Sequence, residues 1–513
     1  MNRLSNILLS LAISQAAVAA AAEKPNVIVI MADDLGYGDL SCYGATTFKT
    51  PHIDSLANGG QLFTQGYCSA STCTPTRYSF LTGTYAFRKK GTGIAPPNGH
   101  LIIDEDTMTL PDLMQKAGYR TAVVGKWHLG LGPQGKGPDW NGEIKPGPRE
   151  IGFDHHFLLP TTNDRVPQVY VTKSRVLNLD PKDPLWVGRK KPSPDHPTGL
   201  THRDTLKMDW SHGHNSTIHN GISRIGFYTG GHAARFRDED LADKWVEKSV
   251  EWIEQNKDRP FFLFYASHDL HVPRIPHERF QGKTPHGFRT DAVVQLDWTV
   301  GEIMKALDKH NLTEKTLVVF CSDNGPVLDD GYKDGAIEKL GKHKPAGIYK
   351  GGKYSVYEGG TRTPFITYWK GKIPAGKSKE VVCTIDLAAS LAALTGTPLP
   401  ASACRDSFDV SKVLLGQPDA RGRESLIQQD NGGRGRFGFR KGQWKLVKHP
   451  GKSARHTDIS KQIANNKVPQ YQLYDLSNDP GEKTNLIGKK TEIANKLKAE
   501  LEALVQAGRS RPE

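Results

Sequence analysis

Two pairs of oxygen-bearing side chains follow apolar runs of the chain, at residues 27–31 and 317–320. The pairs are Asp33 with Asp34, and Asp323 with Asn324. Three carboxylates and one amide form a hard oxygen donor set, which suits Ca²⁺ or Mg²⁺ and not a thiophilic metal. An Asp–Asp pair alone is more typical of a turn that caps a helix, but the second pair favours a metal site.

A cysteine, a proline and an arginine stand close together in the segment 73–83, which reads CTPTRYSFLTG. Cys73 is the reactive side chain of this segment. The residues after Cys73 are expected to enter a helix, whose amino terminus favours an anionic intermediate. The alternative is a buried structural cysteine beside a turn proline.

Four apolar segments of the chain end in polar, ionisable residues. Besides the two named above, they are 121–124 and 261–265, which lead into Lys126 and His128, and into His268 and His271. The ligand site of an open α/β sheet lies beyond the carboxyl ends of its strands, so these side chains should converge. Amphipathic helices are expected at 238–255 and 291–307. The alternation predicts an α/β fold with a large doubly wound sheet.

The chain is expected to have three parts. Residues 1–22 carry a positive residue, a short apolar stretch and small residues, which is typical of a cleaved signal peptide and too weak for a membrane anchor. We therefore expect an exported protein, periplasmic or secreted. The catalytic α/β domain would span 23–420, and within it 132–235 is a loop-rich insertion that shapes a pocket or merely decorates the surface. Residues 421–513 predict a small α+β subdomain with an antiparallel sheet and a terminal helix.

Composition and net charge limit the classes of protein to which this chain can belong. The 513 residues are 37% hydrophobic and 24% charged, so dominant disorder is excluded. The net charge of +13 favours an anionic partner such as nucleic acid, an acidic membrane or an acidic polysaccharide. The basic residues are scattered without a nucleic-acid-binding motif, and export also speaks against nucleic acid. No stretch after the leader is long enough for stable membrane insertion. The oligomeric state is left open.

The segment 73–83 matches C-x-P-x-R followed by L-T-G, the modification signature of formylglycine-dependent sulfatases. Further matching blocks begin at Lys24 (KPNVIVIMADDLGYGD), Gly125 (GKWHLG), Ser322 (SDNG), Glu358 (EGGTRTP) and Leu473 (LYDL). The chain therefore resembles the type I sulfatases of the alkaline phosphatase superfamily, and is similar to arylsulfatases and to N-acetylgalactosamine-sulfatase-like carbohydrate sulfatases. The resemblance implies a large mixed sheet flanked by helices, with a small C-terminal sheet domain.

The resemblance also implies a covalent mechanism. Cys73 would be oxidised to formylglycine (3-oxoalanine) by a formylglycine-generating or an anaerobic sulfatase-maturating enzyme. One hydroxyl of its hydrate would attack sulfur, and the other would then lose its proton and expel sulfate. Modified Cys73 would join the metal set Asp33, Asp34, Asp323 and Asn324, for which the family favours Ca²⁺, and Asp323 could take the attacking hydroxyl's proton.

The remaining roles follow from the same resemblance. Arg77 would hold the hydrate, Lys126 would touch the diol or the sulfate, and His128 would take the second hydroxyl's proton. His271 and Lys353 would stabilise or protonate the departing alkoxide, with His268 and Lys350 as weaker candidates.

Four residues of the insertion are candidates for substrate binding: Asp164, Arg165, His212 and His214. They would hydrogen-bond sugar hydroxyls or a carboxylate, and ordinary loop ion pairs are the alternative. Asp329 and Asp330 could likewise bind the substrate or form ordinary ion pairs.

These observations predict an exported sulfatase that acts on sulfated glycans. Two alternatives stay open: a formylglycine-dependent phosphonate or phosphodiester hydrolase of the same superfamily, and an inactive glycan-binding homologue.

Overall fold

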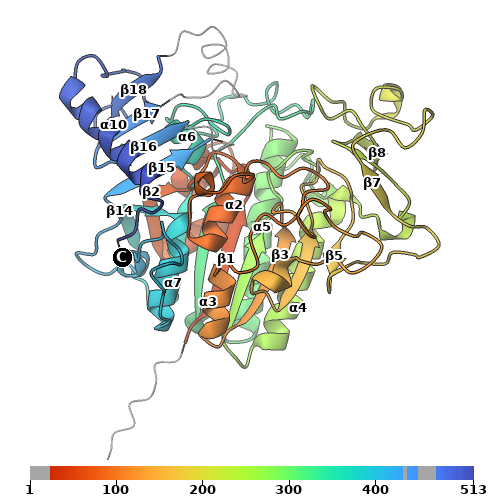
Figure 1. Cartoon of the computed structure of the whole chain (residues 1–513), viewed down its shortest axis with the longest axis horizontal. Coiled ribbons are helices and arrows are strands. Elements are labelled where there is room, and N and C mark those ends of the chain that lie inside the picture. Colours follow the sequence, from red (N-terminus) through yellow and green to blue (C-terminus); the bar gives the residue numbers. More distant parts are fainter. Residues whose placement is uncertain (1–23, 431–435, 449–468, 513) are drawn as a thin grey trace, which may run out of the picture.

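A ten-stranded sheet forms the centre of the molecule (Figure 1). The computed structural model describes residues 24–430, 436–448 and 469–512, so the proposed signal peptide lies outside the described residues. In spatial order the strands are β14 (Gly376–Cys383), β2 (Gln61–Tyr67), β13 (Phe365–Tyr368), β12 (Thr316–Ser322), β1 (Asn26–Ala32), β11 (Phe261–Ala266), β3 (Arg120–Lys126), β4 (His155–Leu159), β5 (Val171–Thr172) and β6 (Arg175–Val176).

The four apolar segments predicted as strands are neighbours at the centre of this sheet. They form β12, β1, β11 and β3, and adjacent strands among them are parallel. Every residue of β1, β11 and β12 is buried, which explains their nearly continuous apolar sequences. Strands β13, β5 and β6 run antiparallel to their neighbours, so the sheet is mixed and the predicted fold class is confirmed.

Helices cover both faces of the sheet. One face carries α1 (Pro51–Gly59), α4 (Leu241–Asn256) and α5 (Phe288–Lys309), and the other carries α2 (Cys73–Thr82), α3 (Leu110–Lys116) and α7 (Leu387–Thr395). Successive β1 side chains alternate between these layers, because strand side chains point to opposite faces. Ile28 and Ile30 pack in the first layer, and Val27 and Val29 in the second. The helices predicted at 238–255 and 291–307 are α4 and α5.

A smaller antiparallel sheet lies at one end of the molecule (Figure 1). Its strands are β15 (Ser425–Gln429), β16 (Phe437–Lys441), β17 (Trp444–Lys448) and β18 (Tyr471–Asp475). Helix α10 (Thr491–Gln506) buries Ala494, Leu497 and Leu501 on one stripe, as its amphipathic pattern predicts. There are two further short helices: α6 (Glu358–Thr361) lies between β12 and β13 of the large sheet, and α8 (Ser411–Leu414) lies between β14 and β15.

The predicted insertion supplies β4, β5 and β6 to the large sheet. The rest of it forms loops and short strands at the opposite end of the molecule (Figure 1). Two small antiparallel ribbons brace it, β7 (Trp186–Gly188) with β10 (Phe227–Thr229), and β8 (Ile218–His219) with β9 (Ile222–Ser223). Among the described residues, no helix is long and apolar enough to cross a bilayer.

Candidate functional site

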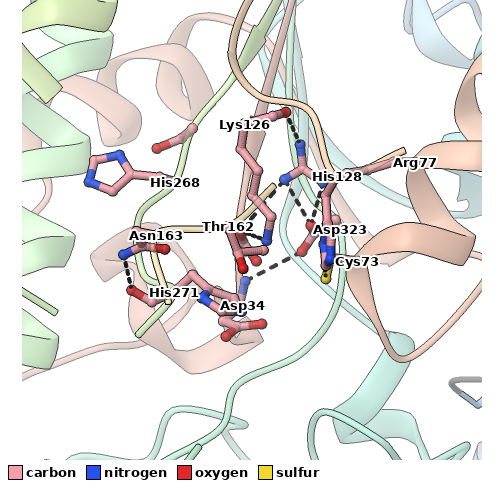
Figure 2. Close-up of polar contacts among 12 residues, drawn as sticks. Asp34, Cys73, Arg77, Lys126, His128, Thr162, Asn163, His268, His271 and Asp323 are labelled. Atoms are coloured by element: carbon pink, nitrogen blue, oxygen red, sulfur yellow. Dashed lines mark hydrogen bonds and ion pairs between the residues drawn. The ribbon is translucent and has the colours of Figure 1, made fainter. Parts of the chain in front are cut away.

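The carboxyl ends of the central strands bring the predicted polar residues together (Figure 2). Backbone hydrogen bonds tie these ends to one another: Asp33 N–H donates to the carbonyl of Asp269, and Asp323 N–H donates to that of Ala32. The convergence expected from parallel strand order is therefore present.

A buried acidic cluster lies at this edge. Its members are Asp33, Asp34, Asp323 and Asn324, and all four are fully buried. The Asn324 amide donates to Asp34 Oδ1 over 2.7 Å, and Asp34 N–H donates to Asp323 Oδ1 over 3.4 Å. Burial raises the pKa of the Asp33 and Asp34 carboxyls, and the Asp323 carboxylate raises that of Asp33 further.

The donor set fits a hard divalent cation. Asp33 Oδ1 and Asn324 Oδ1 find no hydrogen-bond partner among the described residues. Ligand atoms of Asp33, Cys73 and Asp323 lie within 4.8 Å of one another, and so do those of Asp33, Asp34 and His271. Unpaired oxygens at the centre of a buried carboxylate cluster are what Ca²⁺ or Mg²⁺ would satisfy.

Each of the three carboxylates also has a buried cation beside it. Lys126 Nζ bonds to Asp33 Oδ2, and Arg77 Nε donates to Asp323 Oδ2 over 2.9 Å. The third pair, Lys353 Nζ and Asp34 Oδ2, is 2.8 Å apart. These contacts explain how the protein tolerates three buried carboxylates, because buried charges must be paired.

Cys73 is the first residue of α2 and is 1% exposed. Its Sγ lies 3.1 Å from His128 Nδ1, while His128 Nε2 lies 3.1 Å from the Ala95 carbonyl. Nε2 must donate to that carbonyl, so Nδ1 presents its lone pair to Cys73. Burial lowers the pKa of His128 well below its usual value, so the ring is neutral and its Nδ1 lone pair is free of a proton. Burial also raises the pKa of the Cys73 thiol, so the unmodified side chain is no ready thiolate nucleophile.

The backbone around the cluster holds conformations that side chains seldom adopt. Asp34, His128 and Tyr354 have φ values of 58°, 56° and 71°. Each left-handed residue of this kind costs about 1–3 kcal/mol and persists only where its surroundings hold it. Such strain concentrates at functional sites.

A cavity of about 140 Å³ lies next to the cluster, because Cys73 and Lys353 line it and also contact cluster residues. It is lined by Cys73, Ile94, His128, Asp164, Arg165, His212, Gly213, His214, Ile225, His271, Asp330, Lys353 and Tyr354. The cavity thus joins strand-end residues to all four substrate-binding candidates of the insertion. The insertion walls a pocket and is more than surface decoration.

Two of those candidates are tied to Asp164. Arg165 Nη1 contacts both of its carboxylate oxygens at 2.8 and 2.9 Å, and His214 Nε2 lies 2.9 Å from Oδ2. Although burial opposes it, Arg165 holds the pKa of Asp164 well below its usual value, with His271 and His214 adding to the effect. The side chain of His212 is 42% exposed and lies at the rim.

The weaker candidates lie apart from the cavity lining. His268 accepts a hydrogen bond from Trp245 Nε1 over 3.1 Å and points away from the cluster in Figure 2. Lys350 Nζ lies over the Tyr357 ring and bonds to the Glu482 carbonyl on the C-terminal side. Asp329 accepts from Ser211 Oγ and does not line the cavity.

Tyr354 is a cavity residue that sequence reasoning missed. Its hydroxyl donates to Asp330 Oδ1 over 2.9 Å, and Asp330 Oδ2 also accepts from Lys353 Nζ over 2.8 Å. The only sequence signal was its position next to Lys353. Ile94 and Ile225 carry no chemical signal, and only the tertiary structure brings them here.

Comparisons with known proteins match the chain to two family models and to individual relatives. The chain matches the "Sulfatase" family over residues 25–397, and "N-sulphoglucosamine sulphohydrolase, C-terminal" over residues 350–507. It is 49% identical to an N-acetylgalactosamine-6-O-sulfatase of Bacteroides thetaiotaomicron, with 94% of this chain and 93% of the relative covered. It is 33% identical to human arylsulfatase A, with 98% and 93% covered.

Among solved structures, a protein from a study of glycosaminoglycan metabolism by Bacteroides thetaiotaomicron superposes with a TM-score of 0.89 at 47% identity. The match covers 94% of this chain and all of that one. With the family match over most of its length, the chain belongs to the sulfatase family and is a sulfuric ester hydrolase.

Proposed function

We propose that this sulfatase is exported and hydrolyses sulfate esters of sulfated glycans through a formylglycine hydrate made from Cys73. The observation that carries the proposal is the position of Cys73. Its Sγ stands where a hydrate oxygen would stand, within 4.8 Å of ligand atoms of Asp33 and Asp323, and 3.1 Å from His128 Nδ1. A nucleophile, a charged oxygen cage and a base therefore meet at the start of one helix.

The proposed reaction has two covalent steps. One hydroxyl of the hydrate attacks sulfur and its proton passes to Asp323. The bond from sulfur to the substrate oxygen breaks, and the departing alkoxide takes a proton from Lys353 or from protonated His271. The second hydroxyl then gives its proton to His128 Nδ1, the C–O bond to sulfate breaks, and the aldehyde re-forms. Water restores the hydrate by adding to the aldehyde.

The cation proposed for this site is Ca²⁺, with Mg²⁺ as the alternative. Asp33, Asp34, Asp323 and Asn324 would hold it, together with the oxygen that modified Cys73 presents. When bound, it supplies positive charge next to the nucleophile and the sulfate oxygens. Arg77 and Lys126 bring further positive charge to the same place.

On the leaving-group side, His271 and Lys353 line the cavity. His271 Nδ1 lies 2.8 Å from the Val272 carbonyl and must donate to it, so Nε2 is left to face the leaving oxygen. Burial lowers the pKa of His271 well below its usual value, so Nε2 would give a proton to that oxygen only from the imidazolium form. The Lys353 ammonium would stabilise negative charge that develops there.

The proposed substrate is a sulfated N-acetylhexosamine, 6-O-sulfated N-acetylgalactosamine first of all. The relative at 49% identity bears that activity in its name. Asp164, Arg165 and His214 would supply acceptors and donors for sugar hydroxyls. We also propose that a formylglycine-generating or an anaerobic sulfatase-maturating enzyme oxidises Cys73. Residues 1–22 would act as the signal peptide for export.

Replacing Cys73 tests this function. Cys73→Ala should abolish sulfate release from N-acetylgalactosamine 6-sulfate and leave the unfolding transition in place, because the change removes only a buried sulfur. Intact-mass analysis of the wild-type protein should show conversion of the thiol to the aldehyde or its hydrate. Wild-type rates in Cys73→Ala would refute the nucleophile. Faster turnover of an aryl phosphate diester than of an aryl sulfate would refute the substrate class.

A further inference from the structure

The β7/β10 ribbon carries an exposed aromatic surface outside the cavity. Trp186 is 43% exposed, and its indole lies across Gly188, whose added Cβ would come within 2.4 Å of Trp186 Cη2. The ribbon pairs Trp186 with Thr229 and Gly188 with Phe227, so all four residues share one face. We call this outer face, made by Trp186, Gly188, Phe227 and Thr229, the ribbon platform.

The opposite face of the ribbon is anchored in the protein. Tyr228 is 1% exposed, and Val187 packs against the main core. The inner face therefore packs against the protein core, whereas the outer face with Trp186 is not needed for that packing. Trp186 is the exposed member of the outer face, and Gly188, Phe227 and Thr229 are half-buried around it, so the indole is presented on a shallow surface that a ligand can reach.

The ribbon platform continues directly from the wall of the cavity. Ile225 lines the cavity, and its N–H donates to the Asp164 carbonyl over 2.8 Å. Thr229 follows Ile225 by four residues, so their Cα atoms are separated by at most about 14 Å. A chain of sugars that leaves the cavity along this wall would reach the platform.

A second connection runs through His196. Its ring packs edge-on against Phe227 with centroids 6.1 Å apart, and its Nε2 lies 2.8 Å from Thr217 Oγ1. Thr217 comes three residues after His214, which lines the cavity. Two separate segments thus hold the platform at a set position beside the cavity.

The charge next to the platform favours an anionic occupant. Arg189, Lys190 and Lys191 follow β7 directly and are exposed. The carboxylates near the ribbon in the sequence are Asp195 and Asp183, and Asp183 is paired with His232. An indole face packs on the C–H face of a sugar ring, while nearby cations attract carboxylate or sulfate groups.

From these contacts we infer that the ribbon platform is an outer subsite for the sugar residues linked to the sulfated one in an anionic oligosaccharide. This inference rests on the proposed function, because that function places the sulfated residue in the cavity. The platform would add affinity for oligosaccharides without touching the reacting atoms.

The test compares two substrates on Trp186→Ala. One is N-acetylgalactosamine 6-sulfate, and the other is a tetrasaccharide with the same sulfated residue at its non-reducing end followed by a uronic acid. We expect KM for the tetrasaccharide to rise by about fivefold and kcat/KM for the monosaccharide to stay within roughly twofold. Trp186→Phe should retain part of the advantage. Leu200→Ala, which removes a 63% exposed side chain of the same insertion, should change neither substrate.

Equal changes for both substrates in Trp186→Ala, or no change for either, would overturn the inference. Lys190→Ala gives a second variant that leaves the ribbon intact, and it should weaken tetrasaccharide binding more at low salt than at high salt. If the wild-type protein releases sulfate from neither substrate, the proposed function fails first. Calorimetric titration of the tetrasaccharide then still decides the inference: weaker binding by Trp186→Ala than by the wild type supports it, and equal binding overturns it.

Discussion

The side chains of the site form one continuous chain of charges from the acidic cluster to the cavity. Asp34 and Asp330 both accept from Lys353 Nζ at 2.8 Å, so this ammonium links the acidic cluster to the cavity wall. Despite burial, Asp330 and Asp34 hold the pKa of Lys353 well above its usual value. Asp330 also accepts from the Tyr354 hydroxyl, which fixes the direction of its carboxylate.

Asp330→Asn should therefore lower kcat/KM for sulfate release by about tenfold, since the amide cannot balance the Lys353 charge or hold it in place. The effect should fall mainly on kcat if Lys353 acts on the leaving oxygen. Asp329→Asn is the matched control, because the neighbouring Asp329 carboxylate is 38% exposed and outside the cavity lining. Equal losses in both variants would contradict the role assigned to Asp330.

Helix α2 holds the proposed nucleophile at its first residue, and a glycine in the left-handed conformation ends the helix. Cys73 opens it, with its Sγ beside Asp33 and Asp323 of the acidic cluster. Gly83 ends it in the left-handed conformation, with φ 58°. An added Cβ at Gly83 would come within 2.6 Å of Cys404 Cβ and 2.9 Å of Cys404 Cα. The helix end is thus locked against the 404 loop.

Gly83→Ala should destabilise the protein by about 2–4 kcal/mol, from left-handed strain and overpacking together. Gly91→Ala isolates the first contribution, because Gly91 also has positive φ (85°) but nothing within 4 Å of an added Cβ. It should cost about 1 kcal/mol. Urea unfolding measures both variants, and a Gly83→Ala cost no larger than that of Gly91→Ala would show that the Cys404 contact is not tight.

At the scale of the whole molecule, a buried ion cluster joins the small sheet to the catalytic part. Lys445 on β17 bonds to Glu358 Oε1 at the start of α6 over 2.8 Å and lies 3.4 Å from Glu482 Oε1. Glu358 N–H donates to Glu482 Oε2, and Lys350 donates to the Glu482 carbonyl. Burial raises the pKa of Glu482 to about 7, with Lys445 opposing the shift and Glu358 reinforcing it.

The raised pKa of Glu482 predicts how the free energy of unfolding depends on pH. Between pH 4.5 and 7 folded Glu482 keeps its proton while unfolded Glu482 has lost it, so its contribution to stability falls as pH rises. The loss amounts to about 3 kcal/mol across that window. Glu482→Gln should remove this part of the slope when unfolding free energies are compared with the wild type from pH 4.5 to 7. Glu424→Gln, which changes a side chain 82% exposed, should leave the slope as it is. A Glu482→Gln slope parallel to the wild type would contradict the buried-proton account.

Cation binding should also be visible in the stability of the whole chain. A cation that binds only the folded protein adds about 2.7 kcal/mol at one hundred times its Kd. Ca²⁺ should therefore raise Tm, and a chelator should reverse the rise. The shift should shrink strongly in Asp33→Asn and persist in Asp329→Asn. A shift of equal size in both variants would place the cation elsewhere.

Sequence alone determined the fold class and the central strands of this protein. The runs at 27–31 and 317–320 are apolar on both faces of the strand, so both faces must be covered by other elements. The polar residues that follow parallel strands must then meet at one edge of the sheet. The blocks around Cys73 and Lys126 carried the family resemblance that the comparisons confirm. These features depend on local pattern and on strand order, both of which can be read along the chain.

Only the tertiary structure decided which side chains share the cavity. Lys353 lies in it and Lys350 does not, and His271 lines it while His268 packs on Trp245. In the loops that carry these residues, neither strand nor helix periodicity sets the direction of a side chain. Direction depends there on contacts between separate segments, from 23 residues apart for His268 and Trp245 to 319 for Lys353 and Asp34, and those contacts exist only once the chain is folded.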